Sequence, residues 1–132
     1  SSVIPFRRAE SGVEVCLITT RKSGRWGFPK GTIPQHLTPQ EAALEEAHEE
    51  AGLMGMVVGE PLGGYRYRKK GRRETVVVML MEVVSISESW KESEQRQRQW
   101  TDLDGARRLL DRPNLLELLS RAVDRLAGHD DG

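Results

Sequence analysis

Five of the ten residues from Glu41 to Glu50 are glutamates, although the whole chain has 20 acidic and 20 basic residues. On a helix, which turns about 100° per residue, Glu46, Glu49 and Glu50 share one face. Like charges at these spacings destabilise a helix by roughly a few tenths of a kcal/mol per pair. A Mg²⁺ ion would compensate them, because it prefers oxygen ligands and often joins carboxylates to substrate phosphates. The spacing therefore indicates a divalent-metal site, with a solvated acidic helix face as the alternative.

The segment that carries these glutamates has the signals of a helix start and a helix stop. Thr38 is a suitable N-cap, Pro39 fits the first helical position, and Glu41 completes a capping box with Thr38. We therefore predict a helix that runs through Ala51 and stops at Gly52. A second face of this helix is mainly alanine and can approach a sheet closely; it consists of Ala43, Leu44, Ala47 and Ala51.

Three stretches have the composition of β-strands: residues 13–20, residues 56–69 with a break at Gly63-Gly64, and residues 74–86. The last stretch is almost continuously apolar, which indicates burial on both faces. The glycine-containing residues 21–31 are expected to form a loop or an irregular strand, and the polar residues 87–100 are expected to form a loop.

Two more helices are predicted, a short one at residues 103–110 and a long one from Pro113 to Leu126. The apolar stripe of the long helix consists of Leu115, Leu119, Ala122 and Leu126. No internal repeat or domain boundary is visible, so residues 1–132 are expected to form a single domain. The simplest packing of these elements places helices on both faces of a mixed sheet, which makes the fold α/β.

The composition, 37% hydrophobic and 30% charged residues, is typical of a soluble globular domain. The sequence has neither an apolar run of about 18 residues, as a transmembrane helix requires, nor the apolar stretch of a signal peptide at residues 1–12. Its single cysteine, Cys16, lies in the apolar run VEVCLITT and is expected to be a buried thiol, which favours a reducing, cytoplasmic setting. A net charge of zero argues against broad nucleic-acid binding.

The predicted helix and its flanks resemble the Nudix box, G-x5-E-x7-R-E-U-x-E-E-x-G-U, in which U is aliphatic. The matching residues are Gly31, Glu46, Ala47, Glu49, Glu50, Gly52 and Leu53. Two positions depart from the pattern, since Leu37 stands in place of the first glutamate and Glu45 in place of the arginine. The resemblance implies a Nudix-like α/β/α sandwich with a central mixed β-sheet, and hydrolysis of a phosphoanhydride with Mg²⁺ or Mn²⁺.

Carried over by position, the resemblance implies that Glu46, Glu49 and Glu50 hold the metal, with Glu49 and Glu50 as catalytic residues. Gly31 would support a backbone conformation that a side chain would hinder. In the family the box arginine typically pairs with a box glutamate, and Glu45 reverses that charge. A catalytically impaired module that binds a phosphorylated ligand is therefore the alternative. A lysine or arginine elsewhere could replace the missing arginine, but the sequence does not identify it.

Six of the nine residues in the stretch 66–74, RYRKKGRRE, are basic, and such a patch attracts polyanions. Its glycine suggests a turn between two strands. A solvated basic hairpin is the alternative, and an RNA-binding or decapping role is a third possibility. The stretch also contributes to a resemblance to the diphosphoinositol polyphosphate and diadenosine polyphosphate hydrolase branch of the Nudix family. Further segments that carry this resemblance are Arg7-Arg8, VCLITTR, Arg25-Trp26, Trp90 and Arg96-x-Arg98-x-Trp100.

This branch implies a phosphate-rich small-molecule substrate, either a dinucleoside polyphosphate or an inositol pyrophosphate, and a monomer or homodimer. The candidate substrate-binding residues are Arg8, Arg21, Lys30, Gly31, Arg66 and Lys69. Arginine and lysine would bind the phosphates electrostatically. Glu92 is the preferred additional acid in the polar stretch 87–100. Three aromatic residues would favour a nucleotide if they stack on a base, with packing as the alternative: Trp26, Tyr65 and Tyr67.

Overall fold

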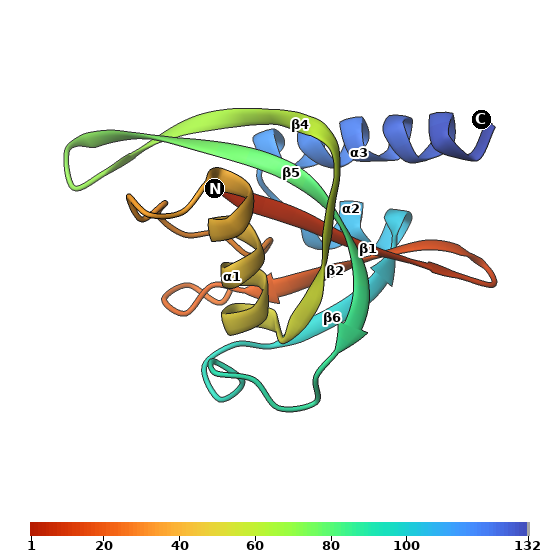
Figure 1. The fold of residues 1–132 in the computed structure, drawn as a ribbon, viewed down its shortest axis with the longest axis horizontal. Coiled ribbons are helices and arrows are strands. Elements are labelled where there is room, and N and C mark those ends of the chain that lie inside the picture. Colours follow the sequence, from red (N-terminus) through yellow and green to blue (C-terminus); the bar gives the residue numbers. More distant parts are fainter. Residues whose placement is uncertain (132) are drawn as a thin grey trace.

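A computed structural model describes the backbone of residues 1–131 and the side chains of residues 1–128 (Figure 1). The elements are β1 (Ser2–Ala9), β2 (Gly12–Thr19), β3 (Trp26–Gly27), α1 (Pro39–Ala51), β4 (Leu53–Lys69), β5 (Arg72–Ile86), β6 (Arg98–Asp102), α2 (Leu103–Leu109) and α3 (Pro113–Asp131). None of the helices in the described part of the chain has the length and apolar character needed to span a membrane.

The strands form one mixed sheet in the order β3-β2-β1-β5-β4, and β6 also pairs with β2. The central pair, β1 and β5, is parallel, whereas every other pair is antiparallel. Helix α1 covers one face of this sheet, and α3 covers the other (Figure 1). The predicted α/β/α sandwich with a central mixed sheet is therefore confirmed.

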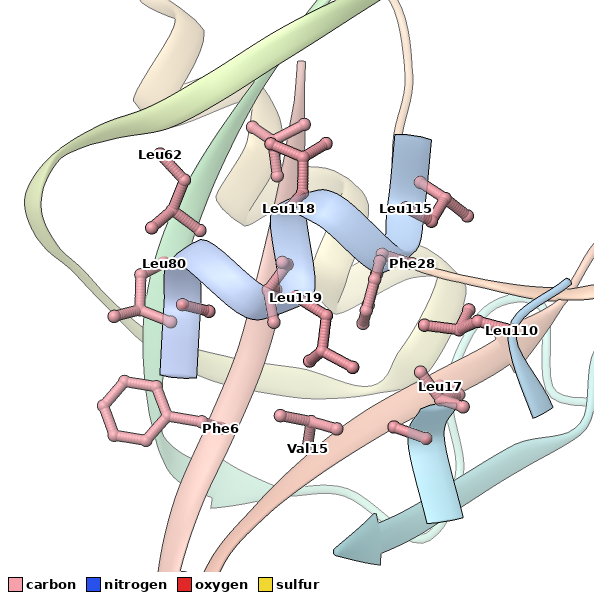
Figure 2. Close-up of a cluster of buried hydrophobic side chains, with 14 of the residues drawn as sticks. Phe6, Val15, Leu17, Phe28, Leu62, Leu80, Leu110, Leu115, Leu118 and Leu119 are labelled. Atoms are coloured by element: carbon pink, nitrogen blue, oxygen red, sulfur yellow. The ribbon is translucent and has the colours of Figure 1, made fainter. Parts of the chain in front are cut away.

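The two faces of the sheet are filled by alternate residues of the same strands, because successive side chains of a strand point to opposite sides. On β1, Ile4 and Phe6 join the cluster beneath α3, whereas Val3 joins the cluster beneath α1. On β5, Leu80 joins the cluster beneath α3, and Met79 joins the cluster beneath α1. Figure 2 shows the larger cluster, in which α3 packs Leu115, Leu118 and Leu119 over the strands. The predicted burial of residues 74–86 on both faces is confirmed for the middle of β5.

Helix α1 has the predicted boundaries and the predicted capping box. The Glu41 backbone N–H donates to the Thr38 hydroxyl at 3.1 Å, and the Thr38 N–H donates to the Glu41 carboxylate at 2.9 Å. At the other end Gly52 adopts the left-handed conformation with φ of 68°, which glycine tolerates without steric cost. The alanines at positions 43, 47 and 51 are fully buried against the sheet. This packing fixes the orientation of the neighbouring face, which carries Glu46, Glu49 and Glu50.

Two strands were not predicted from the sequence pattern. Strand β1 contains Pro5, which usually argues against a central strand. At Pro5, however, β1 pairs with β5 alone, because its pairing with β2 begins at Phe6. Strand β6 lies partly in the stretch 87–100 that was expected to be a loop, and its polar composition follows from the partial exposure of its side chains. Strand β4 also begins earlier than predicted, at Leu53.

The β4–β5 hairpin turns through Lys70 and Gly71, which both have positive φ, 52° and 77°. This pair of angles is typical of a type I′ turn, whose twist matches that of the strands it joins. The predicted turn within the basic stretch is therefore confirmed. The predicted break at Gly63-Gly64 corresponds to a register shift between Val58 and Gly63.

Candidate active site

A cavity of about 1000 Å³ opens between α1, residues 27–33 and the β4–β5 hairpin. Carboxylates and cations both line its wall. Three of the carboxylates, Glu46, Glu49 and Glu50, come from the acidic face of α1, and two more, Glu74 and Glu92, come from other elements. Cationic side chains come from other elements and include Lys30, Lys69 and Arg112. The structure thus brings the three predicted metal-site residues into one cavity together with basic groups from distant parts of the sequence.

Glu50 is the buried carboxylate of this cavity, with 5% of its surface exposed. Its Oε1 accepts a hydrogen bond from the Lys30 backbone N–H at 3.2 Å, and its Oε2 lies 3.5 Å from the Arg96 Nη2. Burial and the hydrogen bond with Glu46 raise the pKa of Glu50 to about 8, although the Arg96 charge opposes this shift. The Glu50 carboxyl group therefore keeps its proton at neutral pH in the metal-free protein.

Gly31 lies directly against the side chain of Glu46. A Cβ atom at position 31 would come within 2.4 Å of the Glu46 Cδ and 2.6 Å of its Oε1. These distances are too short for any residue with a side chain unless Glu46 moves. Here the requirement for glycine comes from the close approach of the carboxylate to the backbone.

The carboxylate donors fit a hard divalent cation such as Mg²⁺, which prefers oxygen ligands. Glu46 and Glu50 are already in hydrogen-bond contact, and the absence of a side chain at Gly31 leaves room for the Glu46 carboxylate. Glu49 lies on the same wall with 28% of its side chain exposed. Within residues 1–128, no three His, Cys, Asp or Glu side chains yet converge at ion-binding distance. Binding one ion through all three glutamates would therefore require side-chain rotation.

Glu92, the predicted additional acid, also lines the cavity but is already paired. Its Oε1 accepts a hydrogen bond from the Arg96 Nε at 2.7 Å. Arg96 also donates from Nη1 to the Thr19 carbonyl oxygen at 2.9 Å. Arg21, a predicted phosphate ligand, lines the same part of the cavity, with its Nε 4.0 Å from the Glu92 carboxylate.

The segment between β5 and β6 is attached to the C-terminal end of α1. The Ser87 N–H donates to the Gly52 carbonyl at 2.8 Å, and the Glu92 N–H donates to the Glu49 carbonyl at 3.1 Å. Arg98 links α1 to this segment, since its Nη1 donates at 2.7 Å to the carbonyl oxygens of both Ala51 and Ser87. This part of the polar stretch is therefore held against the helix that carries the carboxylates.

On the hairpin, strand alternation divides the basic stretch between the two faces of the sheet. Tyr65, Tyr67 and Lys69 line the cavity, whereas the alternate residues Arg66 and Arg68 are exposed and do not. Arg8 does not line the cavity either; it lies near the end of β1, with its guanidinium 5.8 Å from the Phe6 ring centroid. Of the six predicted substrate-binding residues, the structure thus gathers four.

Lys30 connects the carboxylate side of the cavity with the aromatic side. Its Nζ lies 4.2 Å from the ring centroid of Tyr67, a cation–π distance, while its backbone N–H contacts Glu50. Burial lowers the pKa of Lys30, and the positive charges of Arg112 and Lys69 lower it further. The positive charges of Arg112 and Lys69 near Lys30 therefore favour a ligand of negative charge.

Arg112 is a cavity residue that the sequence interpretation missed. Its Nη2 donates to the Trp26 carbonyl at 2.9 Å, which places the guanidinium beside Gly27. Its Nε is buried and has no hydrogen-bond partner among the described residues. The only sequence signal was an arginine before Pro113, just ahead of the predicted long helix. Such a signal gives no indication that Arg112 lines the same cavity as the three glutamates.

The two residues that depart from the Nudix box, Leu37 and Glu45, do not line the cavity. Glu45 is exposed, and Leu37 is only partly buried in the segment before α1. Cys16, in contrast, is fully buried in the cluster beneath α1, as expected. Burial raises the pKa of its thiol to about 12, so the thiol stays protonated and is not a candidate nucleophile.

Residues 2–122 match the family model described as the NUDIX domain. The chain belongs to the Nudix family. Among curated relatives, it is 35% identical over 130 residues to Nudix hydrolase 21, chloroplastic, of Arabidopsis thaliana, a match covering 92% of this chain and 64% of the relative. It is 31% identical over 106 residues to diphosphoinositol polyphosphate phosphohydrolase 3-alpha of Mus musculus, covering 78% of this chain and 63% of the relative. The chain thus spans less than two thirds of the length of either Nudix relative.

Among solved structures, a binary complex of the Caenorhabditis elegans Ap4A hydrolase superposes with a TM-score of 0.78. That match covers 96% of this chain and 95% of the Ap4A hydrolase, at 21% sequence identity. At this identity the likeness shows the Nudix fold alone, and the substrate has to be argued from the cavity.

Proposed function

We propose that this Nudix chain is a divalent-metal-dependent pyrophosphohydrolase that cleaves a phosphoanhydride in a phosphate-rich small molecule. Dinucleoside polyphosphates and diphosphoinositol polyphosphates are the favoured substrate classes. The observation that carries the proposal is that one cavity holds Glu46, Glu49 and Glu50 of α1 together with Lys30, Lys69 and Arg112 from other elements. The names of the Mus musculus relative and of the C. elegans neighbour agree with a polyphosphate substrate.

In this proposal the three glutamates of α1 hold Mg²⁺ or Mn²⁺, with Glu49 and Glu50 closest to the reaction. When bound, such an ion stabilises charge on the transferring phosphoryl group and lowers the pKa of a coordinated water. Glu50 is fixed by the Lys30 N–H and by Arg96, so its carboxylate needs little reordering. Gly31 leaves the space that the Glu46 side chain occupies.

The cationic side chains of the cavity would bind the phosphates that do not react. Arg112, Lys30 and Lys69 each place a positive charge on the lining of the cavity. Bound phosphate would relieve the repulsion that lowers the pKa of Lys30. Tyr65 and Tyr67, with ring centroids 6.3 Å apart, offer an apolar wall beside these charges. A base or an inositol ring could lie against this wall.

The test is phosphate release from a panel of diadenosine polyphosphates, inositol pyrophosphates and nucleoside triphosphates, with Mg²⁺, with Mn²⁺ and with a chelator. We expect metal-dependent turnover of at least one polyphosphate and its loss in Glu49→Gln. The matched control is Glu45→Gln, which removes an exposed carboxylate from the same helix. Binding of a polyphosphate without any turnover would instead establish the alternative, a module that binds a phosphorylated ligand.

The expectations of a cytoplasmic setting and of a monomer or homodimer belong to the same proposal. The buried thiol of Cys16 is consistent with a reducing compartment. Sedimentation of the purified protein with and without a polyphosphate would decide the oligomeric state.

A further inference from the structure

Arg96 is the cationic side chain that pairs with the buried carboxylate of Glu50. Its side chain is only 11% exposed, and its Nη2 lies 3.5 Å from the Glu50 Oε2. Its Nε and Nη1 are held by the Glu92 carboxylate at 2.7 Å and the Thr19 carbonyl at 2.9 Å. The guanidinium is therefore fixed from two sides, which leaves the Nη2 edge to face Glu50.

Helix α1 itself provides no such cation. Glu45, the box position where arginine is expected, is acidic and exposed. Among the described residues, the other cation paired with a box glutamate is Lys91, whose Nζ lies 3.8 Å from the Glu49 Oε1 and whose side chain is 70% exposed. An exposed pair of this kind contributes little, because water screens it. The fixed positive charge at the carboxylate wall thus comes from Arg96.

We propose that Arg96 is a positioning residue, which orients the Glu50 carboxylate and supplies the charge that α1 lacks at position 45. The inference rests on the proposed function, because it concerns the same three glutamates. Arginine suits the role better than lysine, since its planar guanidinium directs donors to three different acceptors in one plane. Residues that orient a metal-binding carboxylate typically contribute about 10- to 100-fold in metal affinity or activity.

The test compares Arg96→Met, which keeps the stem without the charge, with Arg96→Lys. Mn²⁺ binding is measured by electron paramagnetic resonance at one fixed pH, and kcat and KM are measured on the best polyphosphate. The matched control is Arg7→Met, because Arg7 also combines an ion pair, to Glu14 at 2.8 Å, with a ring contact, to Trp100 at 4.1 Å. Arg7 does not line the cavity.

We expect Arg96→Met to weaken Mn²⁺ binding by about 10-fold or more and to lower kcat by about 10- to 100-fold. KM should change by less than about threefold, because an orienting role acts on the chemical step. Arg96→Lys should recover part of both losses, and Arg7→Met should match the wild type. If Arg96→Met does not fold, a partial loss of Mn²⁺ affinity in Arg96→Lys supports the proposal, and wild-type affinity overturns it.

Three outcomes would overturn the proposal. Tighter Mn²⁺ binding in Arg96→Met would mean that Arg96 acts only as a nearby positive charge. A rise in KM at constant kcat would make Arg96 a phosphate ligand instead. Unchanged Mn²⁺ affinity with a lower thermal midpoint in both variants would make it a structural anchor of the segment between β5 and β6. If the wild type hydrolyses nothing, the proposed function fails, but the Mn²⁺ titration still decides the role of Arg96.

Discussion

Replacing Glu50 by glutamine should change how the metal-free protein responds to pH. Burial raises the pKa of Glu50 from 4.5 to about 8 in the folded state. Between these values the unfolded chain has lost the proton while the folded protein keeps it. The free energy of unfolding of the wild type therefore falls as the pH rises through this window. In Glu50→Gln this contribution is absent, because the amide is neutral in both states.

The size of the effect follows from the width of the window. Each pH unit between 4.5 and about 8 should lower the unfolding free energy of the wild type, relative to Glu50→Gln, by up to about 1.4 kcal/mol. At neutral pH the accumulated difference has an upper limit of about 3 kcal/mol. Above a pH of about 8 the difference should be constant, since Glu50 is then ionised in both states.

The assay is urea unfolding in the presence of a chelator at several pH values, for the wild type, Glu50→Gln and Glu45→Gln. Because Glu45 is exposed, the unfolding free energy of Glu45→Gln should change with pH in parallel with that of the wild type. Adding Mg²⁺ should stabilise the wild type more than Glu50→Gln, since binding to the folded state adds RT ln(1 + [L]/Kd). Parallel pH profiles for the wild type and Glu50→Gln would refute the argument that burial controls this carboxylate.

Three further substitutions test two cavity residues, Gly31 and Arg112, and the exposed Glu45 beside the cavity. Gly31→Ala should displace Glu46 and lower kcat by about 10-fold or more, measured by phosphate release, with a thermal midpoint close to that of the wild type. Arg112→Met should raise KM by about 10- to 100-fold at nearly constant kcat if a charged hydrogen bond to phosphate is lost. Glu45→Arg should change the rate by less than about threefold, because an exposed ion pair with Glu49 is weak and Arg96 already contacts Glu50. A large gain in rate would show that the site of the wild type is impaired. A large loss of rate would show that Glu45 itself contributes to the activity.

The sequence predicted α1 and its acidic face because the signals there are local. The capping box at Thr38, the stop at Gly52 and the buried alanines all depend on residues within one or two helical turns. The spacing of the Nudix box added a second, independent constraint on the same segment. Fold class and family were therefore accessible without any long-range information.

The cationic side of the cavity depends on contacts between residues far apart in the sequence. Arg96 reaches the Thr19 carbonyl across a separation of 77 residues, and Arg112 reaches the Trp26 carbonyl across 86. Local composition carries no signal for either contact. Within the basic stretch, the sequence showed a cluster of charge, but only the strand register separates Lys69, which lines the cavity, from Arg66, which does not.

The elements that line the cavity differ in how they are anchored, and this has a consequence for how the protein can vary. The helix that carries the glutamates is held in place by its buried alanine face and by backbone hydrogen bonds between α1 and the segment that follows β5. The β4–β5 hairpin instead extends past α1 and ends in a two-residue turn (Figure 1). An exposed side chain on the cavity face of the hairpin, such as Lys69, can therefore be exchanged without repacking α1. Ligand preference could diverge there while the carboxylates of α1 stay the same.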